Sequence, residues 1–361
     1  MRKEVLTSDI LVIGAGPAGL AAGYSAAQSG RSGLLVDENP TPGGQIWRGE
    51  WGNPRSPKAA FWFKKIHEGC MPILTGVRII AEAEEGTLLG EGADTLYKLR
   101  YKKVILATGA RERFLPFPGW TLPNVMGAGG LQAMVKMGLP IQGKRVVVAG
   151  TGPLLLAVAA YLRTRGARVL LVAEQTPLSR LLRLGWGLWR FPSKSLQALF
   201  LRGQILGVPY RSSCWPISVE GKGRLERVTL RCGSQTWEIR CDYLACGFHL
   251  VPNVELARLL NCEVHGGYVR VNALQETSRP NVFCAGEPTG IGGVHLALLE
   301  GQIAGYAAAG NLKRARALFA ARNRWRIFAE RLNRAFALRP ELKRLPDGQT
   351  IICRCEDVPL E

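Results

Sequence analysis

A glycine fingerprint near the start of the chain has the residue types and spacing of a pyrophosphate-binding turn. It follows the apolar run 10–13 and opens a stretch rich in small residues. In such a turn the first glycine allows a tight change from strand to helix, the second lets the backbone approach the phosphates, and the third lets helix and strand pack closely. The helix N-terminus adds unpaired N–H groups and a partial positive charge. The candidate contacts are Gly14, Gly16, Pro17, Ala18 and Gly19.

An acidic residue stands where this turn needs one. Asp37 follows the apolar run 34–36 and lies 23 residues after Gly14, close to the spacing of about 20 at which an acid meets the ribose. Glu38 is the neighbouring candidate. A glycine-rich turn that binds no ligand is the alternative interpretation, but the strand before, the helix after and the acid together favour nucleotide binding.

A second, altered copy of the fingerprint begins at Gly150. It follows the apolar run 146–149, but Leu155 replaces the third glycine and Ala173 stands at the position that matches Asp37. A leucine where helix and strand approach most closely should weaken the site. We therefore predict that the fold survives with reduced affinity, its ligand being NAD(P), another adenine nucleotide or none. The candidate contacts are Gly150, Gly152, Pro153 and Glu174, the acid one place after Ala173.

The composition is that of a globular protein with two or three domains. The chain has 361 residues, of which 47% are hydrophobic, and no apolar stretch approaches the roughly 20 residues of a membrane-spanning helix. The first residues lead directly into a predicted strand, which leaves no room for a signal peptide. Nine cysteines without such a signal favour reduced thiols. We expect a cytoplasmic protein without a transmembrane segment.

The net charge of +19 comes in part from residues 311–345, where eleven Lys and Arg stand against two glutamates. A basic helix of this kind can bind nucleic acid, an anionic membrane or an acidic partner. No nucleic-acid module accompanies it, so we predict a solvated face or a docking surface for a partner subunit, and no nucleic acid.

The segment 180–206 combines leucines and aromatic residues with several arginines. Gly185, Gly187 and Pro192 argue against one continuous helix. Packing against a partner subunit or a domain lid is the favoured interpretation. Peripheral contact with the inner face of a membrane is the alternative.

The order of the predicted elements indicates an α/β protein with two Rossmann-like dinucleotide-binding domains, each a three-layer ββα arrangement, the second inserted in the first. Each domain contains one fingerprint, and the chain returns to the first domain in a segment that includes the apolar run 282–285. The expected boundaries are 1–115 with 245–310 for the first domain, 116–244 for the degenerate NAD(P)-type domain, 311–345 for a basic helical C-terminal extension, and 346–361 for the start of a further small domain.

Four motifs together resemble the two-dinucleotide-domain flavoproteins related to thioredoxin reductase and the pyridine nucleotide-disulfide oxidoreductases. They are the fingerprint with Asp37, the run 43–45, the run 107–109 and the late run 277–287. The resemblance implies FAD in the first domain, with Asp37 at the adenosine ribose. Glu287 stands where the family usually has Asp, beside the ribityl or pyrophosphate part. The further implied FAD contacts are Gly43, Gly44, Gln45, Arg48, Thr108, Gly109, Gly286, Glu287, Gly293 and Val294.

Longer motifs narrow the resemblance. The runs 43–48, 108–113, 117–120 and 286–293 look like those of the alpha subunits of hydrogen cyanide synthase, opine oxidase and hydroxyproline or proline dehydrogenase. The resemblance implies an FAD-binding oxidoreductase subunit of a heteromeric amine or amino-acid dehydrogenase. It would relay electrons from a catalytic flavoprotein partner similar to glycine or sarcosine oxidase, and a further partner would be a small ferredoxin-like subunit. Disulfide reductases of the wider family carry CxxC or CxxxxC beside the flavin, and no such pair stands near the flavin motifs.

Two other functions remain as alternatives. One is a self-sufficient NAD(P)H-dependent FAD reductase that acts on a ferredoxin or quinone. The other is a non-catalytic nucleotide-binding scaffold subunit. The sequence shows no paired carboxylates, metal set or nucleophile triad, so no catalytic residue is assigned.

Cys353 and Cys355 form a tight pair, and only six residues follow Cys355. By resemblance they match the start of a small domain, homologous to bacterioferritin-associated ferredoxin, that can hold a [2Fe-2S] cluster. Such a cluster usually takes four thiolates. The pair would therefore hold a cluster only with ligands from missing residues or from another subunit. A truncated chain is the favoured interpretation; a vestigial motif and two ordinary cysteines are the others.

Overall fold

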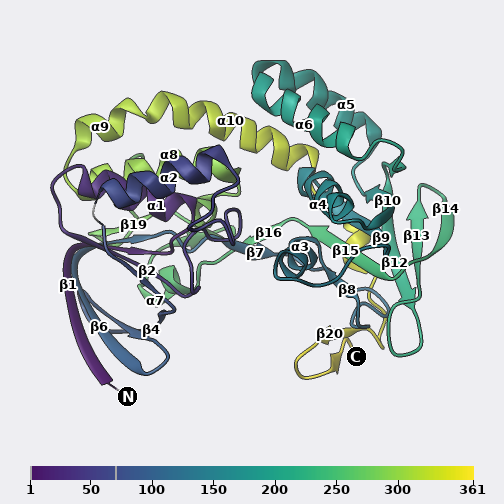
Figure 1. Cartoon of the computed structure of the whole chain (residues 1–361), viewed down its shortest axis with the longest axis horizontal. Coiled ribbons are helices and arrows are strands. Elements are labelled where there is room, and N and C mark those ends of the chain that lie inside the picture. Colours follow the sequence, from purple (N-terminus) through teal and green to yellow (C-terminus); the bar gives the residue numbers. More distant parts are fainter. Residues whose placement is uncertain (1, 70) are drawn as a thin grey trace. The chain divides into compact units, whose positions relative to one another are not determined.

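The computed structural model describes residues 2–69 and 71–361, which form two compact units. The first unit combines Met1–Arg111 with Val251–Glu330, and the second combines Glu112–Leu250 with Arg331–Glu361. Each unit contains a largely parallel sheet flanked by helices (Figure 1). The predicted α/β class, with a second Rossmann-like fold inserted in the first, is confirmed.

The sheet of the first unit is parallel at its centre, where the first fingerprint begins. The central strand β1 (Arg2–Ile13) pairs in parallel with β2 (Gly33–Asp37) on one side and with β6 (Thr95–Leu106) on the other. Strand β3 pairs in parallel with β2, and β19 pairs in parallel with β6. Strands β5 and β4 add an antiparallel edge next to β6. These strands are β3 (Ile73–Thr75), β4 (Arg78–Glu84), β5 (Thr87–Glu91) and β19 (Val282–Cys284).

Helices cover both faces of this sheet (Figure 1). Side chains alternate along β1, so Ile10 joins the core under α1, α2 and α8, while Leu11 joins the core on the side of α7. The first and eighth helices pack closely because Gly301 and Gly305 face the α1 backbone, where a Cβ would overlap carbonyl oxygens. The helices are α1 (Pro17–Ala27), α2 (Pro57–Glu68), α7 (Glu255–Leu259) and α8 (Gly293–Ala308).

The second unit has a five-stranded parallel sheet in the order β11-β10-β9-β15-β8. Its central strand β9 (Arg145–Thr151) leads into the second fingerprint and lies between β10 (Arg168–Glu174) and β15 (Tyr243–Phe248). Two helices pack on one face, and an antiparallel three-stranded sheet contributes to the core on the other. These elements are β8 (Val125–Gly127), α3 (Ala128–Lys136), α4 (Pro153–Thr164), β11 (Tyr210–Arg211), β12 (Cys214–Glu220), β13 (Arg227–Cys232) and β14 (Gln235–Arg240).

A helical hairpin between β10 and β11 leaves large apolar side chains in solvent. It consists of α5 (Leu178–Gly187), the 3-10 turn η1 (Leu188–Arg190) and α6 (Pro192–Gln204) (Figure 1). Trp186 is 86% exposed and Trp189 is 70% exposed. We call its exposed apolar side chains the apolar surface; they are Leu178, Leu182, Trp186, Trp189, Leu196, Leu199 and Phe200.

The basic segment 311–345 is helical for much of its length and is divided between the two units. The helix α9 (Leu312–Ala317) and most of α10 (Phe319–Ala335) belong to the first unit, and the chain after Glu330 belongs to the second. The physical reason is burial within each unit. Arg322 donates to the Ala273 carbonyl at 2.7 Å in the first unit, and Leu342 is buried in a core of the second. Residues 346–361 likewise belong to the second unit.

Short elements complete the described part of the chain. Within it, no helix is long and apolar enough to cross a membrane. The remaining elements are β7 (Ala110–Glu112), β16 (Leu250–Pro252), β17 (Val264–His265), β18 (Tyr268–Val269), η2 (Glu287–Thr289), η3 (Pro340–Arg344), β20 (Ile351–Cys353) and β21 (Val358–Pro359).

Candidate functional site

The fingerprint of the first unit forms a turn that only glycine fits. Gly14 has a φ of +103°, and a side chain there would overlap the Ala107 carbonyl; a side chain on Gly19 would overlap the Gly14 carbonyl. The helix α1 begins at Pro17, with Ala18 next, and has no side-chain cap and no acid in its first turn. No acid of the helix's own first turn offsets its N-terminal partial positive charge, which favours binding of an anion.

The Gly43-Gly44 loop lies against this turn. The Gly43 N–H donates to the Ala15 carbonyl at 2.8 Å. A Cβ on Gly44 would lie 3.0 Å from the Gly16 Cα, so the loop passes close to the second glycine of the fingerprint. Gln45 follows with an exposed side chain. The structure thus brings together two motifs that are separated in the sequence.

Asp37 is the acid that holds the turn. Its buried carboxylate accepts from the Ala15 N–H at 2.5 Å, and its other oxygen accepts from the backbone and side-chain N–H groups of Asn39 at 2.7 and 2.8 Å. Glu38 points elsewhere: it is exposed and its nearest ion-pair partner is Arg78, at 3.9 Å. Asp37 is therefore the acid that lies at this turn, and Glu38 is not drawn into it; the contact of either with a ribose stays a prediction.

Arg48 brings an unpaired donor to this region. Its guanidinium donates to the Asn39 side-chain oxygen at 3.3 Å, so it is tied to the loop that follows Asp37. Its Nε is buried and has no hydrogen-bond partner among the described residues. A buried donor without a partner costs free energy, and a phosphate or hydroxyl oxygen would satisfy it.

Thr108 and Gly109 are held by a residue that the motifs did not indicate. The Thr108 hydroxyl donates to the Asn253 carbonyl at 2.7 Å, and the Asn253 side chain donates back to the Thr108 carbonyl at 2.9 Å. The Asn253 N–H donates to the Gly109 carbonyl at 3.0 Å. Arg111 contacts the Asn253 side-chain oxygen and forms an ion pair with Glu255, each at 2.8 Å. No sequence pattern pointed to Asn253, because its partners lie over 140 residues away.

Glu287 lies at the N-terminus of α8. Its carboxylate accepts from the N–H groups of Gly292 at 3.2 Å and Gly293 at 3.0 Å. Burial raises the pKa of Glu287 to about 7, and the two N–H groups oppose this effect. The adjacent Val294 packs against the helix-covered core. The longer Glu in place of the family's usual Asp thus reaches the amides at the start of α8.

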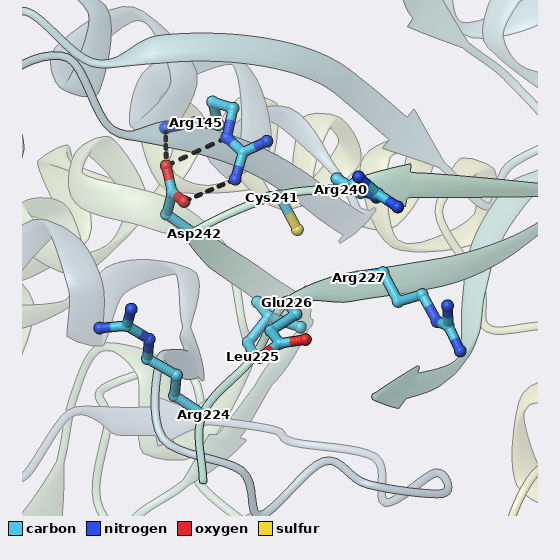
Figure 2. A pocket seen from close by; sticks show the side chains of 8 residues that line it. All are labelled: Arg145, Arg224, Leu225, Glu226, Arg227, Arg240, Cys241 and Asp242. Carbon is cyan, nitrogen blue, oxygen red and sulfur yellow. Dashed lines mark hydrogen bonds and ion pairs between the residues drawn. The ribbon is translucent and has the colours of Figure 1, made fainter. Parts of the chain in front are cut away.

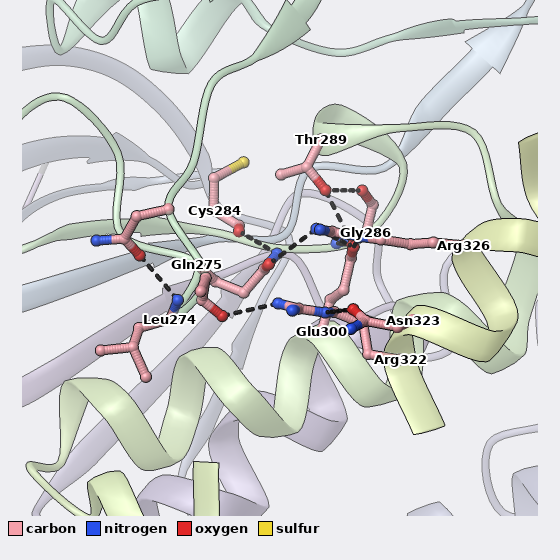
Figure 3. Close-up of polar contacts among 11 residues, drawn as sticks. Leu274, Gln275, Cys284, Gly286, Thr289, Glu300, Arg322, Asn323 and Arg326 are labelled. Carbon is pink, nitrogen blue, oxygen red and sulfur yellow. Dashed lines mark hydrogen bonds and ion pairs between the residues drawn. The ribbon is translucent and has the colours of Figure 1, made fainter. Parts of the chain in front are cut away.

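A buried polar network positions the Gly286-Glu287 turn (Figure 3). The almost fully buried Glu300 carboxylate accepts from the Gly286 N–H at 3.2 Å and from the Thr289 hydroxyl at 2.9 Å. Arg326 of α10 donates to the other oxygen at 3.1 Å and also to the Gln275 side chain at 3.3 Å. Burial raises the pKa of Glu300, and Arg326 opposes it. Sequence reasoning missed this network because its members are scattered over four segments.

The residues of the first unit fit FAD. The uncapped N-terminus of α1, the glycine cradle and the unpaired Arg48 Nε suit a pyrophosphate or its neighbouring hydroxyls. Gly286 requires glycine for the same reason as the fingerprint, since its φ is +83° and a Cβ would lie 2.9 Å from the Ala18 Cβ. A dinucleotide can therefore be held by backbone amides from both ends of this unit's sequence.

The second fingerprint retains its acid, contrary to the sequence count. A register shift between Val169 and Leu171 places Glu174, rather than Ala173, opposite Gly150 in the β10–β9 ladder. The Glu174 carboxylate accepts from the Gly152 N–H at 2.8 Å. Burial raises the pKa of Glu174, and hydrogen bonds oppose this. Counting residues assumed a regular strand, and the irregularity moves the acid by one position.

The fold also accommodates the leucine at the third glycine position. Leu155 is fully buried between α4 and the sheet. The residue opposite Gly150 on β15 is Gly247, and a Cβ there would lie 3.4 Å from the Leu155 side chain. In the first unit the corresponding neighbours are Gly19 and Ala107. In the second unit the glycine is on the strand (Gly247) and the larger residue is on the helix (Leu155), so the helix and the sheet still pack closely.

Comparison with known proteins agrees with this geometry. The family of pyridine nucleotide-disulphide oxidoreductases matches residues 8–301. The chain belongs to this family. It is therefore an FAD-dependent oxidoreductase, of a family whose members imply binding of FAD and NAD(P). As a flavoprotein it is similar to hydrogen cyanide synthase subunit HcnB of Pseudomonas aeruginosa, with 31% identity over 96% of this chain and 82% of HcnB.

Two further similarities support the assignment. One of the opine oxidase subunits of Rhizobium meliloti is 29% identical over 97% of this flavoprotein and 82% of its own length. The fold is similar to that of thioredoxin reductase from T. acidophilum, with a TM-score of 0.66 at 19% identity, over 84% of this chain and 98% of that protein. Both agree with the resemblance inferred from the motifs.

The cysteines of the flavoprotein differ in part from expectation. Cys214 and Cys232 form a disulfide, although reduced thiols were predicted. The reason is their position: they are directly opposite each other in the β12–β13 ladder. Cys241 and Cys246 have CxxxxC spacing but are buried free thiols of the second unit, and burial raises the pKa of both, that of Cys241 to about 12. Such thiols are unreactive.

Cys353 and Cys355 lie at an exposed turn between β20 and β21, with their sulfur atoms 3.1 Å apart. The hydrogen bond between them lowers the pKa of Cys353. No group of three or more metal-ligating side chains occurs among the described residues. The described residues thus supply two of the four thiolates that a [2Fe-2S] cluster usually needs, and do not fit a complete cluster.

An arginine-rich cavity of about 390 Å³ lies at the N-terminal end of β9, away from the second fingerprint (Figure 2). Arg145, the first residue of β9, forms an ion pair with Asp242 at 2.8 Å there. The fingerprint begins at Gly150, at the opposite end of the same strand, so the cavity is separate from the nucleotide site of this unit. Its lining residues are Arg145, Arg224, Leu225, Glu226, Arg227, Arg240, Cys241 and Asp242.

Proposed function

We propose that this flavoprotein is the FAD-binding oxidoreductase subunit of a heteromeric amine or amino-acid dehydrogenase, with an opine, proline, hydroxyproline or glycine as substrate. A catalytic partner similar to glycine or sarcosine oxidase oxidises the substrate, and this chain relays the electrons. Two relatives that align with nearly its whole length are named as subunits, one of hydrogen cyanide synthase and one of opine oxidase.

The observation that carries the proposal is the apolar surface of the α5–α6 hairpin. Exposed apolar patches of this kind mark interaction sites. Trp186 and Trp189 are exposed, and tryptophan is among the residue types enriched in binding hot spots. The hairpin residues 178–204 include five Lys and Arg and no Asp or Glu. The surface therefore suits a partner whose docking face is apolar with acidic residues around it.

The thiols also favour a relay over a disulfide reductase. The first unit's described free cysteines, Cys262 and Cys284, are buried, and burial raises the pKa of both. Neither has the exposed, electropositive surroundings of a reactive thiol. A disulfide substrate would therefore meet no reactive thiol among the described residues of the FAD-binding unit.

The proposed roles of the residues follow from their contacts. The amides at the start of α1 would hold the pyrophosphate and Asp37 the adenosine ribose, while residues 43–45, Thr108 and Gly109 would line the flavin. When bound, FAD supplies a carrier for two electrons. Glu287 holds a proton in a fraction of molecules near neutral pH, because its pKa is raised to about 7. Its protonation changes the charge at the start of α8.

Further parts of the proposal concern additional groups and location. Cys353 and Cys355 would provide half the ligands of a [2Fe-2S] cluster, the rest coming from further sequence or a ferredoxin-like subunit. NAD(P) or another adenine nucleotide is the proposed ligand class of the second unit. The proposed location is the cytoplasm, with peripheral contact at the inner face of the membrane as the alternative use of the apolar surface.

Anaerobic reduction of the bound flavin tests the proposal. The flavoprotein is purified alone and as a co-expressed complex with a glycine/sarcosine-oxidase-like protein, and each is mixed with candidate amino acids and with NADH or NADPH. We expect the amino acid to bleach the flavin of this chain only in the complex. Rapid bleaching of the isolated chain by NADH or NADPH would instead support a self-sufficient reductase. A flavin that stays oxidised while the complex turns over would identify a scaffold.

A further inference from the structure

A short segment of this chain lies at the place where a Rossmann fold binds its ligand. In open parallel α/β sheets, ligands bind at the carboxyl ends of the strands. In the second unit, Thr151 ends β9, Gln175 follows β10 and His249 follows β15. All three side chains contact the backbone of Phe336–Arg339. This segment belongs to the second unit.

The contacts between the strand ends and the segment are specific. The Phe336 carbonyl accepts from the Thr151 hydroxyl at 3.3 Å and from His249 Nε2 at 2.8 Å. The Gln175 side chain donates to the Ala337 carbonyl at 3.3 Å and accepts from the Arg339 N–H at 3.2 Å. One buried amide thus pairs with the backbone on both sides of Leu338, as a neighbouring strand would.

The Phe336 side chain covers the fingerprint itself. It is only 6% exposed, and its ring is the nearest group to a Cβ built on Gly152, at 4.0 Å. Gly152 is the second glycine, where the backbone must approach a pyrophosphate. The apolar ring therefore takes the space that the phosphates would need.

The acid of the second fingerprint is also engaged. Glu174 is fully buried, and its two oxygens accept from the N–H groups of Gly152 at 2.8 Å and Thr176 at 2.9 Å. Gln175 and Thr176 are likewise buried. A ribose could reach this carboxylate only if the groups above it moved away.

We propose that Phe336–Arg339 is a built-in occupant of the second dinucleotide site, and that a nucleotide with an adenosine pyrophosphate group binds there only when the segment is released. The segment then acts as an autoinhibitory contact for this site. The inference rests on contacts inside the second unit and does not depend on the proposed electron relay.

Nucleotide binding by the FAD-loaded full chain tests the competition. NADH, NADPH and ADP are titrated by calorimetry into wild type, Phe336→Ala, and the matched control Lys343→Ala, an exposed position seven residues further on. We expect Phe336→Ala to bind at least one of them about tenfold more tightly or better than wild type and control. Equal dissociation constants in all three proteins, or no binding by any, would overturn the proposal.

Amide hydrogen exchange tests the location of the segment and remains informative if Phe336→Ala misfolds. In wild type we expect slow exchange at Arg339, whose N–H is bonded to Gln175. Gln175→Ala should accelerate exchange there while β9 and β15 remain protected, and a saturating nucleotide should do the same in wild type. Rapid exchange of Arg339 in untreated wild type, or unchanged protection in Gln175→Ala, would contradict the proposal.

Discussion

The Glu174 carboxylate accepts a hydrogen bond of 2.8 Å from the Gly152 amide, as the Asp37 carboxylate accepts one from Ala15 in the first unit. In both folds, therefore, the acid accepts a hydrogen bond from the fingerprint backbone, in the second unit from an amide one position later than in the first. The two folds differ in the groups that lie next to the fingerprint turn. In the first unit an unpaired arginine donor remains nearby, whereas in the second the chain's own Phe336 covers the turn.

The first prediction concerns Asp37, which anchors the fingerprint and the loop after β2. Asp37→Ala removes a carboxylate that accepts three hydrogen bonds, and bonds to charged groups are worth about 1.5–3 kcal/mol each. We expect FAD affinity to fall at least about tenfold, measured as flavin retained per protein by absorbance. Glu38→Gln, at the exposed neighbouring position, should retain FAD like wild type. Equal retention by both variants would contradict the assignment of Asp37.

The second prediction tests whether Gly247 on β15 makes room for Leu155 on α4. Leu155→Ala should destabilise the protein by about 2–5 kcal/mol, the usual cost of a buried Leu→Ala change. Gly247→Ala brings a methyl group 3.4 Å from Leu155 and 3.3 Å from Ala128, so it should also destabilise. The double variant should be less destabilised than the sum, because the shortened residue makes room. Strict additivity in urea unfolding would show that the two positions do not share this space.

The third prediction concerns the Glu300–Arg326 pair behind the Gly286 turn. Arg326→Ala leaves a nearly fully buried carboxylate without its cation, and we expect a loss of about 2 kcal/mol or more in unfolding free energy. Losing the cation also raises the pKa of Glu300 further. The loss should therefore be larger at about pH 8 than at about pH 5, because a lower pH protonates the unpaired carboxyl in a larger fraction of the variant molecules. Arg316→Ala, at an exposed position of α9, is the control and should cost less than about 0.5 kcal/mol.

The sequence predicted the parts of the site that depend on local spacing. Gly14, Gly19 and Asp37 belong to one strand–helix–strand unit, so counting along the chain was sufficient. The same counting put Ala173 at the position that matches Asp37, with the candidate Glu174 one place later, because a strand irregularity is not visible in the residue pattern. The resemblance predicted FAD contacts for Gly286 and Glu287, and Gly286 does lie close to Ala18 of the fingerprint; the contacts with FAD stay predictions.

Long-range contacts account for what the sequence did not reveal. Gly247 compensates for Leu155 from a strand 92 residues later, and Asn253 holds Thr108 from 145 residues away. The position of Phe336 over the second fingerprint is similar. The basic segment was predicted to be a solvated face or a docking surface, yet the Phe336 and Ala337 carbonyls and the Arg339 N–H form hydrogen bonds and the Phe336 side chain is buried. Burial of this kind depends on tertiary packing, which overrides local pattern.

The fourth prediction follows from the raised pKa of Glu287, about 7 in the folded chain. A carboxyl whose pKa is higher when folded than when unfolded stabilises the fold at low pH, and this contribution disappears as the pH rises through the folded value. Compared with Glu287→Gln, the FAD-free wild type should therefore lose about 1–3 kcal/mol of stability between about pH 5 and about pH 8. Urea unfolding of both proteins at the two pH values measures this. If the difference in unfolding free energy between wild type and Glu287→Gln is the same at both pH values, or changes in the opposite direction, the pKa of Glu287 is not raised.

The last prediction concerns the apolar surface. Trp186→Gln and Trp189→Gln change exposed residues, so unfolding free energy should shift by less than about 0.5 kcal/mol. Binding to the glycine/sarcosine-oxidase-like partner should weaken at least about tenfold, because exposed tryptophans of this kind act as hot spots. Met137→Gln, another exposed apolar position in the second unit, should leave binding unchanged.

Vesicles separate the partner from the membrane as the occupant of this surface. The wild type and both tryptophan variants are mixed with anionic phosphatidylserine–phosphatidylcholine vesicles and separated by flotation. Docking to a protein partner predicts that none of the three floats and that only partner binding is lost. Flotation of the wild type that both substitutions abolish, together with unchanged partner affinity, would instead assign the surface to a lipid headgroup layer, because Trp and Leu beside Arg also suit that interface. The five cations and the absence of acids in residues 178–204 make either interaction weaken with added salt, so salt dependence alone does not separate them.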